Sequence, residues 1–347
     1  MSATTSVSTY TYVYQSILGV PEYVGFRSCL SWPAVFIFAT LLYTIPSVLV
    51  FARIAVFYFT NGERIRKNGL RVEIFQSFLL MQFWNNVSIL GDFLMFRIPN
   101  STLFTSFCAS HNPQLFLRFT VFLYQWSAYT SAMLTVLFCV MRVAILYFAP
   151  KKNRRTVGFK AEFEWLKVML QMITVVAPVT MLVGFLLSLP HFLSEGLCLQ
   201  LFEPYPFGSI IIFSQFHYNN IHYVGLAHLL LNNSATFIVI VMNILMLLKI
   251  RERRSLSTST RHSQNSRAEK TLTGTMVILV FPMIVSQLIA LGELFHFEFL
   301  SYILLLRPIF LDTRVHVVSV YFYVTHPVFK KQLANPPTSI SHTNQKS

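Results

Sequence analysis

The stretch RPIFLDTRVHVVSVYFYVTHPVFKK, Arg307 to Lys331, decides how the whole chain has to be interpreted. It is mostly apolar and aromatic, yet it contains four ionisable side chains: Arg307, Asp312, Arg314 and His316. An ionisable side chain at bilayer depth costs about 3 kcal/mol or more unless it faces a partner or a water-filled cavity. The stretch is therefore either outside a membrane or a working part of a helix bundle.

The composition of the chain favours the membrane. Of its 347 residues, 54% are hydrophobic and only 12% are charged, whereas a soluble domain is about 25% charged. The net charge of +14 is typical of membrane proteins, which concentrate Lys and Arg in their cytoplasmic loops. We therefore expect the lipid bilayer as a partner and no nucleic acid. The first thirty residues lack the basic and apolar regions of a signal peptide, so no cleaved leader is expected.

Seven apolar segments are long enough to cross a bilayer, which takes roughly 20 residues. The fold class predicted is an all-α membrane protein with a seven-transmembrane helix bundle at 32–324, between an amino-terminal segment at 1–31 and a tail at 325–347. The spans are roughly 32–58, 72–96, 114–148, 166–189, 223–250, 272–292 and 299–324.

The basic residues set the orientation. About 20 lysines and arginines lie in the loops and the tail on one side of the predicted bundle, and only Arg27 and Arg97 lie on the other. The amino terminus is therefore expected outside and the tail in the cytoplasm.

Two cysteines then face an oxidising compartment. Cys108 precedes the third span, and Cys198 lies in the long second outer loop. We expect a disulfide between them, because Cys29 and Cys139 lie near or inside spans; the alternative is two unpaired thiols. The sequon at Asn100 is also outside and is a candidate for glycosylation, although it lies close to the membrane.

Five segments of this bundle carry a family resemblance: PEYVGF before the first span, LLYTIPSVLV within it, FCVMRVAILYFAPKKN at the end of the third, AEKTLTGTM at the start of the sixth and TRVHVVSVYFYVTHPVFKK at the end of the seventh. They resemble the nematode serpentine chemoreceptors of class U, with a sister class such as class G as the alternative. The similarity runs from about residue 21 to 331. It implies a G-protein-coupled chemosensory receptor in the plasma membrane of a neuron's cilium or dendrite. A small-molecule ligand and a heterotrimeric G protein are the implied partners, and a receptor dimer is a further candidate.

The cytoplasmic ends of spans three and six differ from the rhodopsin pattern. Met141, Arg142 and Val143 stand where an acidic-Arg-aromatic triplet is usual. Glu269 at the start of span six is the acidic residue that we expect to hold Arg142 in an inactive state; the alternative is an arginine that only reaches the interface. Pro282 is expected to be the pivot of span six, or otherwise a static kink.

The outer half of span three holds the candidates for a ligand pocket. Tyr124, Gln125, Trp126 and Tyr129 lie beneath the loop that Cys198 would tie down, and Arg307 of span seven is a further candidate. The alternative for each aromatic residue is simple packing. Asp92 of span two and Arg118 of span three lie at similar expected depths, so a salt bridge between them is one expectation; the alternative is that each side chain reaches the interface independently.

The polar residues of span seven are expected to divide between two faces. Asp312 and His316 fall within about 40° of each other on a helix, at a depth similar to Asn85 and Asn86 of span two. The hypothesis is a hydrated network of Asp312, His316 and one of these amides that repacks on activation; the alternative is a static polar contact. Arg314 lies on another face and is expected to reach the inner surface.

Two other classes of protein remain as alternatives. A seven-span ion channel or transporter would need a polar path or broken helices in related halves, and neither pattern is visible. An intramembrane enzyme is not expected, because Asp92 lies nearer the outer interface than Asp312 and no metal-ligand spacing is present. We therefore predict no catalytic residue, no metal and no cofactor.

Overall fold

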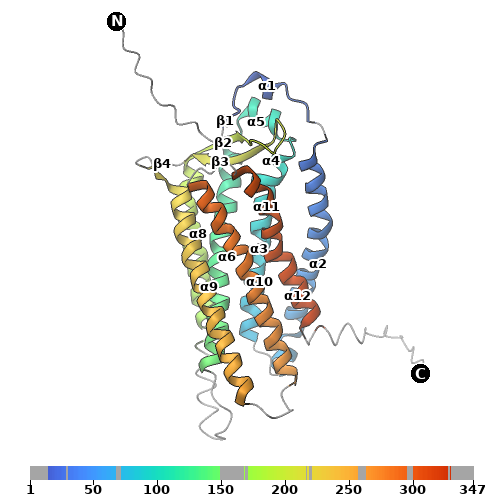
Figure 1. Ribbon diagram of the computed structural model, residues 1–347, viewed down its shortest axis with the longest axis vertical. Helices are drawn as coiled ribbons and strands as arrows, with labels where there is room; N and C mark the ends of the chain where they lie inside the picture. Colours follow the sequence, from blue (N-terminus) through green and yellow to red (C-terminus); the bar gives the residue numbers. More distant parts are fainter. Residues whose placement is uncertain are drawn as a thin grey trace, which may run out of the picture.

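The computed structural model describes residues 15–28, 30–67, 72–148, 168, 171–215, 217–218, 221–256, 263–294, 300–326 and 329. These residues form an elongated helix bundle with a small β-sheet at one end (Figure 1). The predicted seven-helix bundle is confirmed, and its spans are interrupted by short π-helical segments. The spans are α2 (Trp32–Lys67); α3 (Val72–Asp92) with η1 (Phe93–Arg97) and α4 (Ile98–Asn100); α6 (Gln114–Phe148); η2 (Met172–Val176) with α8 (Ala177–Leu193); α9 (Tyr223–Leu256); α10 (Ser263–Leu294); and α11 (Leu300–Asp312) with η4 (Thr313–Val317) and α12 (Val318–Thr325).

The lengths of these helices suit a multi-pass membrane protein. In the described part of the chain, 5 helices are long and apolar enough to cross a membrane by length and composition. The second and seventh spans fall outside this group, and they are the two that carry the charged residues Asp92, Arg97, Arg307 and Asp312. The third span begins and ends as predicted.

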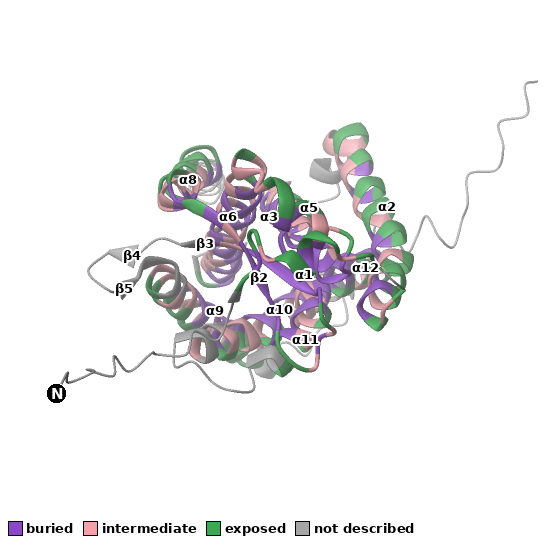
Figure 2. Ribbon diagram, turned by 90° about the horizontal axis from the view of Figure 1, so that it is seen from above, coloured by how far each residue is buried: buried purple, intermediate pink, exposed green. Residues whose placement is uncertain are grey.

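The third span, α6, forms the centre of the bundle, whereas the first, α2, lies at its rim. In the most apolar window of α6, 78% of residues are buried, against 17% in that of α2. Figure 2 shows α2 at the edge with exposed residues along its length. Lipid tails surround a membrane helix, so the outward apolar side chains of α2, such as Phe38, Leu42 and Phe59, match their surroundings.

Two glycines allow neighbouring helices to approach α6 closely. A Cβ atom on Gly91 of α3 would lie 2.8 Å from the Cα atom of Tyr124. A Cβ atom on Gly184 of α8 would lie 2.5 Å from the hydroxyl oxygen of Thr130. Small residues at such contacts are typical of membrane helix packing, and here they hold α3 and α8 against the central helix.

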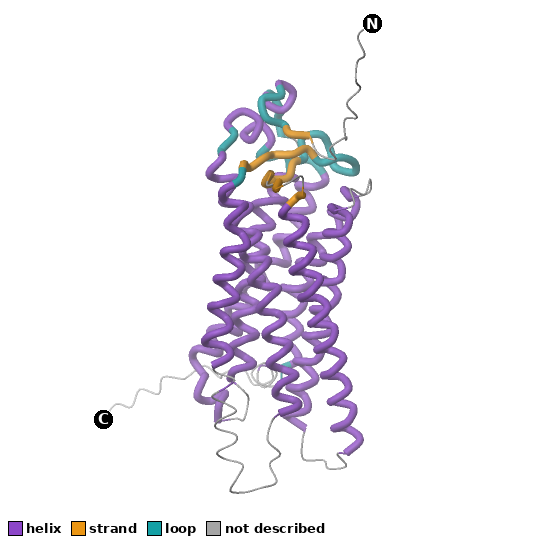
Figure 3. The backbone as a smooth tube through the Cα atoms, turned by 90° about the vertical axis from the view of Figure 1, so that its left-hand side faces the viewer, coloured by secondary structure: helices purple, strands orange, loops and turns teal. Residues whose placement is uncertain are grey.

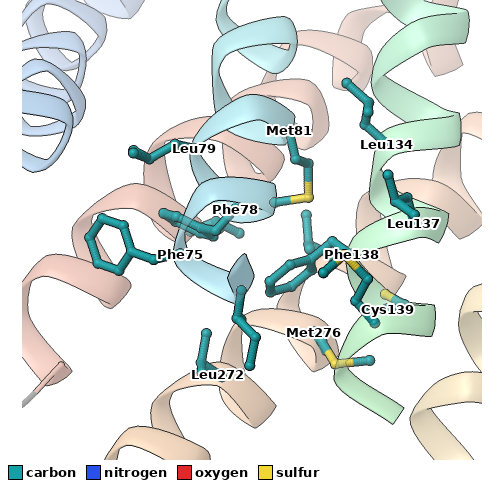
Figure 4. Packing of buried hydrophobic residues seen from close by; sticks show 14 of the residues in the cluster. Phe75, Phe78, Leu79, Met81, Leu134, Leu137, Phe138, Cys139, Leu272 and Met276 are labelled. Atoms are coloured by element: carbon teal, nitrogen blue, oxygen red, sulfur yellow. The ribbon is translucent and has the colours of Figure 1, made fainter. Parts of the chain in front are cut away.

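The half of the bundle farther from the sheet is filled by aromatic and sulfur-containing side chains. Phe75, Phe78, Phe138 and Met276 converge there from α3, α6 and α10 (Figure 4). Phe78 also stacks on Phe322 of α12, with 4.1 Å between ring centroids. This cluster ties the second, third, sixth and seventh spans together toward the end opposite the sheet.

The opposite end is closed by a three-stranded antiparallel sheet in the order β1-β2-β3 (Figure 3). Cys198 of β2 pairs across the ladder with Ile212 of β3, and a disulfide joins Cys198 to Cys108 of α5. The second outer loop is therefore a folded lid, a feature that its sequence did not predict. The elements of this end are β1 (Gln15–Ser16), α1 (Pro21–Val24), α5 (Thr105–His111), β2 (Glu195–Gln200), β3 (Ile210–Gln215), β4 (His217–Tyr218) and β5 (Ile221–His222).

Candidate functional site

A cavity of about 50 Å³ lies between the lid and the second, third, sixth and seventh spans. Ile211 and Phe213 of β3 form one wall; they are two positions apart, so they point to the same face of the strand. The remaining walls come from the helices. Their lining residues are Met95, Tyr124, Gln125, Val285, Ser286, Ile289, Arg307, Phe310 and Leu311.

Three of the five expected pocket residues line this cavity, and two do not. Tyr124, Gln125 and Arg307 are in its wall. Trp126 points to another face of α6, where its indole nitrogen donates to the carbonyl of Met181 at 3.0 Å. Tyr129 is buried in the bundle, outside the cavity wall. These two placements correct the expectation, because four residues so close in a helix turn through more than one face.

A buried ion cluster, defined as Asp92, Arg97, Arg307 and Asp312, lies next to this cavity. Arg97 is 2% exposed and donates three hydrogen bonds: from Nε to Asp92 Oδ2 at 2.7 Å, and from Nη1 and Nη2 to the two oxygens of Asp312 at 3.0 and 2.6 Å. A bidentate pair of this kind is among the strongest hydrogen-bonded contacts in proteins. Arg97 therefore binds span two to span seven.

Arg307 and the first span complete the surroundings of the cluster. Arg307 Nη2 lies 3.1 Å from Asp92 Oδ1. The hydroxyl of Tyr43 donates to Asp312. His316 Nε2 lies 3.8 Å from Asp312 Oδ1 and 3.2 Å from the hydroxyl oxygen of Thr44. Two carboxylates and two guanidiniums balance each other in charge, which a buried cluster requires, and the contacts join spans one, two and seven.

Two π-helical turns place these side chains. Asp92 directly precedes η1, and Asp312 directly precedes η4. In an α-helix, Arg97 would lie about 140° around the axis from Asp92. A π turn closes with an i to i+5 hydrogen bond, so Arg97 returns to the side of Asp92. Such turns are frequent at functional sites.

The ion cluster corrects several expectations for the outer half of the bundle. Arg97, which was counted with the basic residues of the outer side, is buried in the bundle. The Asp92–Arg118 salt bridge is wrong, because Asp92 contacts Arg97 and Arg307, while Arg118 Nε donates to the side chain of Gln114 at 3.3 Å. Asp92 and Asp312 also lie at one depth, since both bind Arg97.

Of the two partners expected for Asp312, His316 is confirmed, whereas neither of the two candidate amides makes the expected contact. His316 does lie beside Asp312. Asn85 instead accepts a hydrogen bond from Ser131, and the amide of Asn86 donates to the backbone carbonyl of Gln82 at 2.7 Å. The neighbours of Asp312 come from α2 and η1, because Arg97 already occupies the position expected for an amide.

Arg314 also differs from the expectation. Its Nη2 donates to the hydroxyl of Thr135 at 2.9 Å, within the bundle, so it does not reach for the inner surface. Arg142 is buried at 2% exposure, whereas the side chain of Glu269 lies outside the described residues, and their pairing stays a prediction. Pro282 lies inside α10, and its carbonyl accepts a hydrogen bond from Ser286 at 3.0 Å.

Of the two features predicted for the outer loops, the disulfide is present and the glycosylation site is buried. Cys108 and Cys198, the pair expected to be joined, form the disulfide that holds the lid. Asn100 is only 7% exposed. A glycan on this side chain would have no room in the fold, which corrects the glycosylation expectation.

Sequence reasoning missed Arg97 as a cluster residue, and it missed Tyr43 and Thr44 altogether. The available signal was the spacing of Asp92 and Arg97 at one end of an apolar helix. Two side chains five residues apart meet only if the turn between them is π-helical. For Tyr43 and Thr44, polar groups in an otherwise apolar first span were the only indication.

A seven-helix bundle with a disulfide-tied lid over an internal cavity is the architecture typical of receptors of the G-protein-coupled type. The family described as "Serpentine type 7TM GPCR chemoreceptor Sru" matches residues 17–332. The chain belongs to this family, and the class U resemblance is confirmed. It is also similar to "Serpentine receptor class U-26" of Caenorhabditis elegans, with 27% identity over 283 residues, which cover 80% of this chain and 90% of that protein.

Proposed function

We propose that this receptor binds a small external molecule in the cavity beneath β3 and activates a heterotrimeric G protein at its cytoplasmic end. The single observation that carries the proposal is the position of Arg307, which lines the cavity and belongs to the ion cluster. A ligand in the cavity therefore acts on a contact that joins spans two and seven. Its place of action is the plasma membrane of a sensory neuron, at the cilium or dendrite.

The change of state follows from differential binding. A ligand shifts a two-state bundle only by the difference between its affinities for the two states. A ligand group that engages Arg307 changes the strength of the Arg307–Asp92 contact, whereas Arg97 keeps its three hydrogen bonds to Asp92 and Asp312. The outer ends of spans two and seven can then shift relative to each other while Arg97 still joins them.

Arg142 and Glu269 are the proposed restraint at the cytoplasmic end. Arg142 is buried near the inner end of α6, and Glu269 belongs to the first turns of α10. Glu269→Gln removes the charge and should raise ligand-independent signalling. Unchanged basal signalling at equal surface expression would count against this restraint.

A compound screen with a calcium or cyclic-nucleotide readout tests the ligand site. Val285→Phe places an aromatic ring at the cavity wall, and it should abolish responses to any compound that activates the parent. Val277→Phe is the matched control, because Val277 lies on the same helix with 50% exposure toward the surroundings. Equal responses from both variants and the parent would exclude this cavity as the ligand site.

A further inference from the structure

Gln125 presents an unused acceptor at the cavity. Its side chain is 4% exposed and lines the cavity wall. Among the described residues, no hydrogen-bond donor contacts its Oε1 atom. A buried carbonyl oxygen without a donor is unfavourable. A bound molecule that donates a hydrogen bond to this oxygen would therefore gain binding free energy.

Arg307 presents donors to the same cavity. Arg307 is 7% exposed, and its guanidinium carbon lies 5.2 and 5.0 Å from the ring centroids of Phe96 and Tyr124. The contact of its Nη2 with Asp92 Oδ1 at 3.1 Å is an ion pair without hydrogen-bond geometry. An acceptor oxygen on a bound molecule is the group that suits a guanidinium in this position.

The charge balance of the ion cluster disfavours charged ligands. Asp92 and Asp312 balance Arg97 and Arg307, so a carboxylate in the cavity would leave one uncompensated negative charge in a buried site. An ammonium group would lie against the guanidinium of Arg307. The cluster therefore favours an uncharged molecule.

The size and lining of the cavity limit the rest of the molecule. Its volume of about 50 Å³ is about four times what a single water needs, which corresponds to a chain of about four or five non-hydrogen atoms. Apart from Gln125, Arg307, Ser286 and the phenol of Tyr124, the lining side chains are apolar.

We propose that the cavity takes a small uncharged alcohol with a short apolar body. Its hydroxyl oxygen accepts a hydrogen bond from Arg307, and its hydroxyl hydrogen is donated to Gln125 Oε1. A hydroxyl group is the smallest group that serves both residues. The inference names the ligand class for the site of the proposed function, but binding itself requires no G protein.

Ligand-observed NMR on the full-length receptor in nanodiscs provides the test, with empty nanodiscs as the lipid background. The probes are 1-butanol, butanoate and butylammonium at neutral pH. We expect saturable binding of 1-butanol and at least tenfold weaker binding of the two ions. Saturable binding of either ion at equal or higher affinity, or no saturable binding of 1-butanol, would overturn the proposal.

A pair of glutamine variants tests the role of Gln125. Gln125→Leu keeps the size of the side chain and removes the orphan acceptor, so it should weaken 1-butanol binding about tenfold without lowering the melting temperature. Gln287→Leu is the control, since Gln287 is buried and hydrogen-bonded to Thr236 away from the cavity lining. Equal affinities for the parent and Gln125→Leu, or equal losses in both variants, would refute the assigned contact.

The ligand class and the proposed function fail in different ways. A receptor that signals through a G protein to other compounds but never binds 1-butanol refutes the alcohol class and retains the function. A receptor that binds 1-butanol, as we expect, but evokes no G-protein response to it or to any screened compound supports the alcohol class and refutes the function.

Discussion

The carboxylate of Asp312 is held by hydrogen bonds from Arg97 and Tyr43 at 4% exposure. Removal of one partner from a buried ion pair leaves an uncompensated charge and costs about 3 kcal/mol or more. We therefore predict that Asp312→Asn lowers the melting temperature of the purified receptor well below that of the parent. The double variant Arg97→Gln/Asp312→Asn restores the charge balance and should recover part of the loss.

The control for Asp312→Asn is Glu252→Gln. Glu252 accepts a hydrogen bond from Lys249 at 2.7 Å on the exposed surface of α9, and pairs of this kind contribute about 0.5 kcal/mol. If Asp312→Asn were as stable as this control, the cluster would not bind spans two and seven together. If its surface expression, basal signalling and evoked signalling all matched the parent, Asp312 would also not belong to the switch.

The buried side chain of His326, directly after the last span, should make the stability of the folded receptor depend on pH. Burial lowers its pKa from 6.5 to about 4, and the positive charge of Arg142 acts in the same direction. At a pH between these two pKa values, His326 binds a proton in the unfolded chain but not in the folded chain. Stability should therefore fall as the pH falls from about 6.5 to about 4, by up to about 3 kcal/mol from this residue.

His326→Phe should remove this part of the pH dependence. A phenyl ring can keep the stack on Phe322, whose centroid lies 4.8 Å from that of His326, and it cannot take up a proton. The measurement is the melting temperature of both proteins across this pH range. An equal decline in both would show that His326 is not the group responsible.

At the level of helices, Gly91 allows the close contact of α3 with α6. Alanine there would bring a methyl group to 2.8 Å from the Cα atom of Tyr124, a backbone atom that cannot move alone. We predict that Gly91→Ala destabilises the receptor by about 1–3 kcal/mol and weakens ligand binding, because Tyr124 and Gln125 line the cavity. The measurements are thermal denaturation and a binding titration.

Gly62→Ala is the matched control for Gly91→Ala. A Cβ atom on Gly62 would have no neighbour within 4 Å, and alanine favours a helix more than glycine does. This variant should therefore be as stable as the parent or slightly more stable. A loss of stability equal to that of Gly91→Ala would mean that helix contact is not the cause.

How much could be predicted from the sequence differs between long helices, short strands and π-helical turns. Helix α6 could be placed because its apolar run from Gln114 to Phe148 has no break. The lid sheet was missed because strands of six residues joined by an aromatic and proline-containing turn give a weak signal. Asp92, Arg97 and Asp312 were each noticed as charged, but their meeting depends on π turns that no residue pattern announces.

The candidate cavity also contains residues that could be predicted from the sequence, whereas the exclusion of another residue could not. Tyr124, Gln125 and Arg307 could be named from their depth in the predicted spans, and all three line the cavity. The exclusion of Trp126 needed the rotation of α6, which is set by its contacts with Met181 and Trp84. Depth follows from position along the chain, whereas the direction of a side chain follows from packing.

For the whole molecule, orientation and coupling are the central properties. The basic loops predict that the lid end faces outside and that the opposite end meets an acidic partner surface. An epitope tag at the amino terminus should be accessible on intact cells, and a tag on the tail only after permeabilisation. The reverse accessibility would contradict the receptor topology.

The most direct test of the central claim is the dependence of the ligand-evoked response on G proteins. The receptor is expressed at equal surface density in cells that lack Gα subunits and in the same cells with Gα restored. Calcium and membrane current are then recorded during application of an activating compound. We predict no response without Gα and a full response after its restoration. A ligand-evoked current of equal size in the cells that lack Gα would contradict the account and identify the protein as a channel.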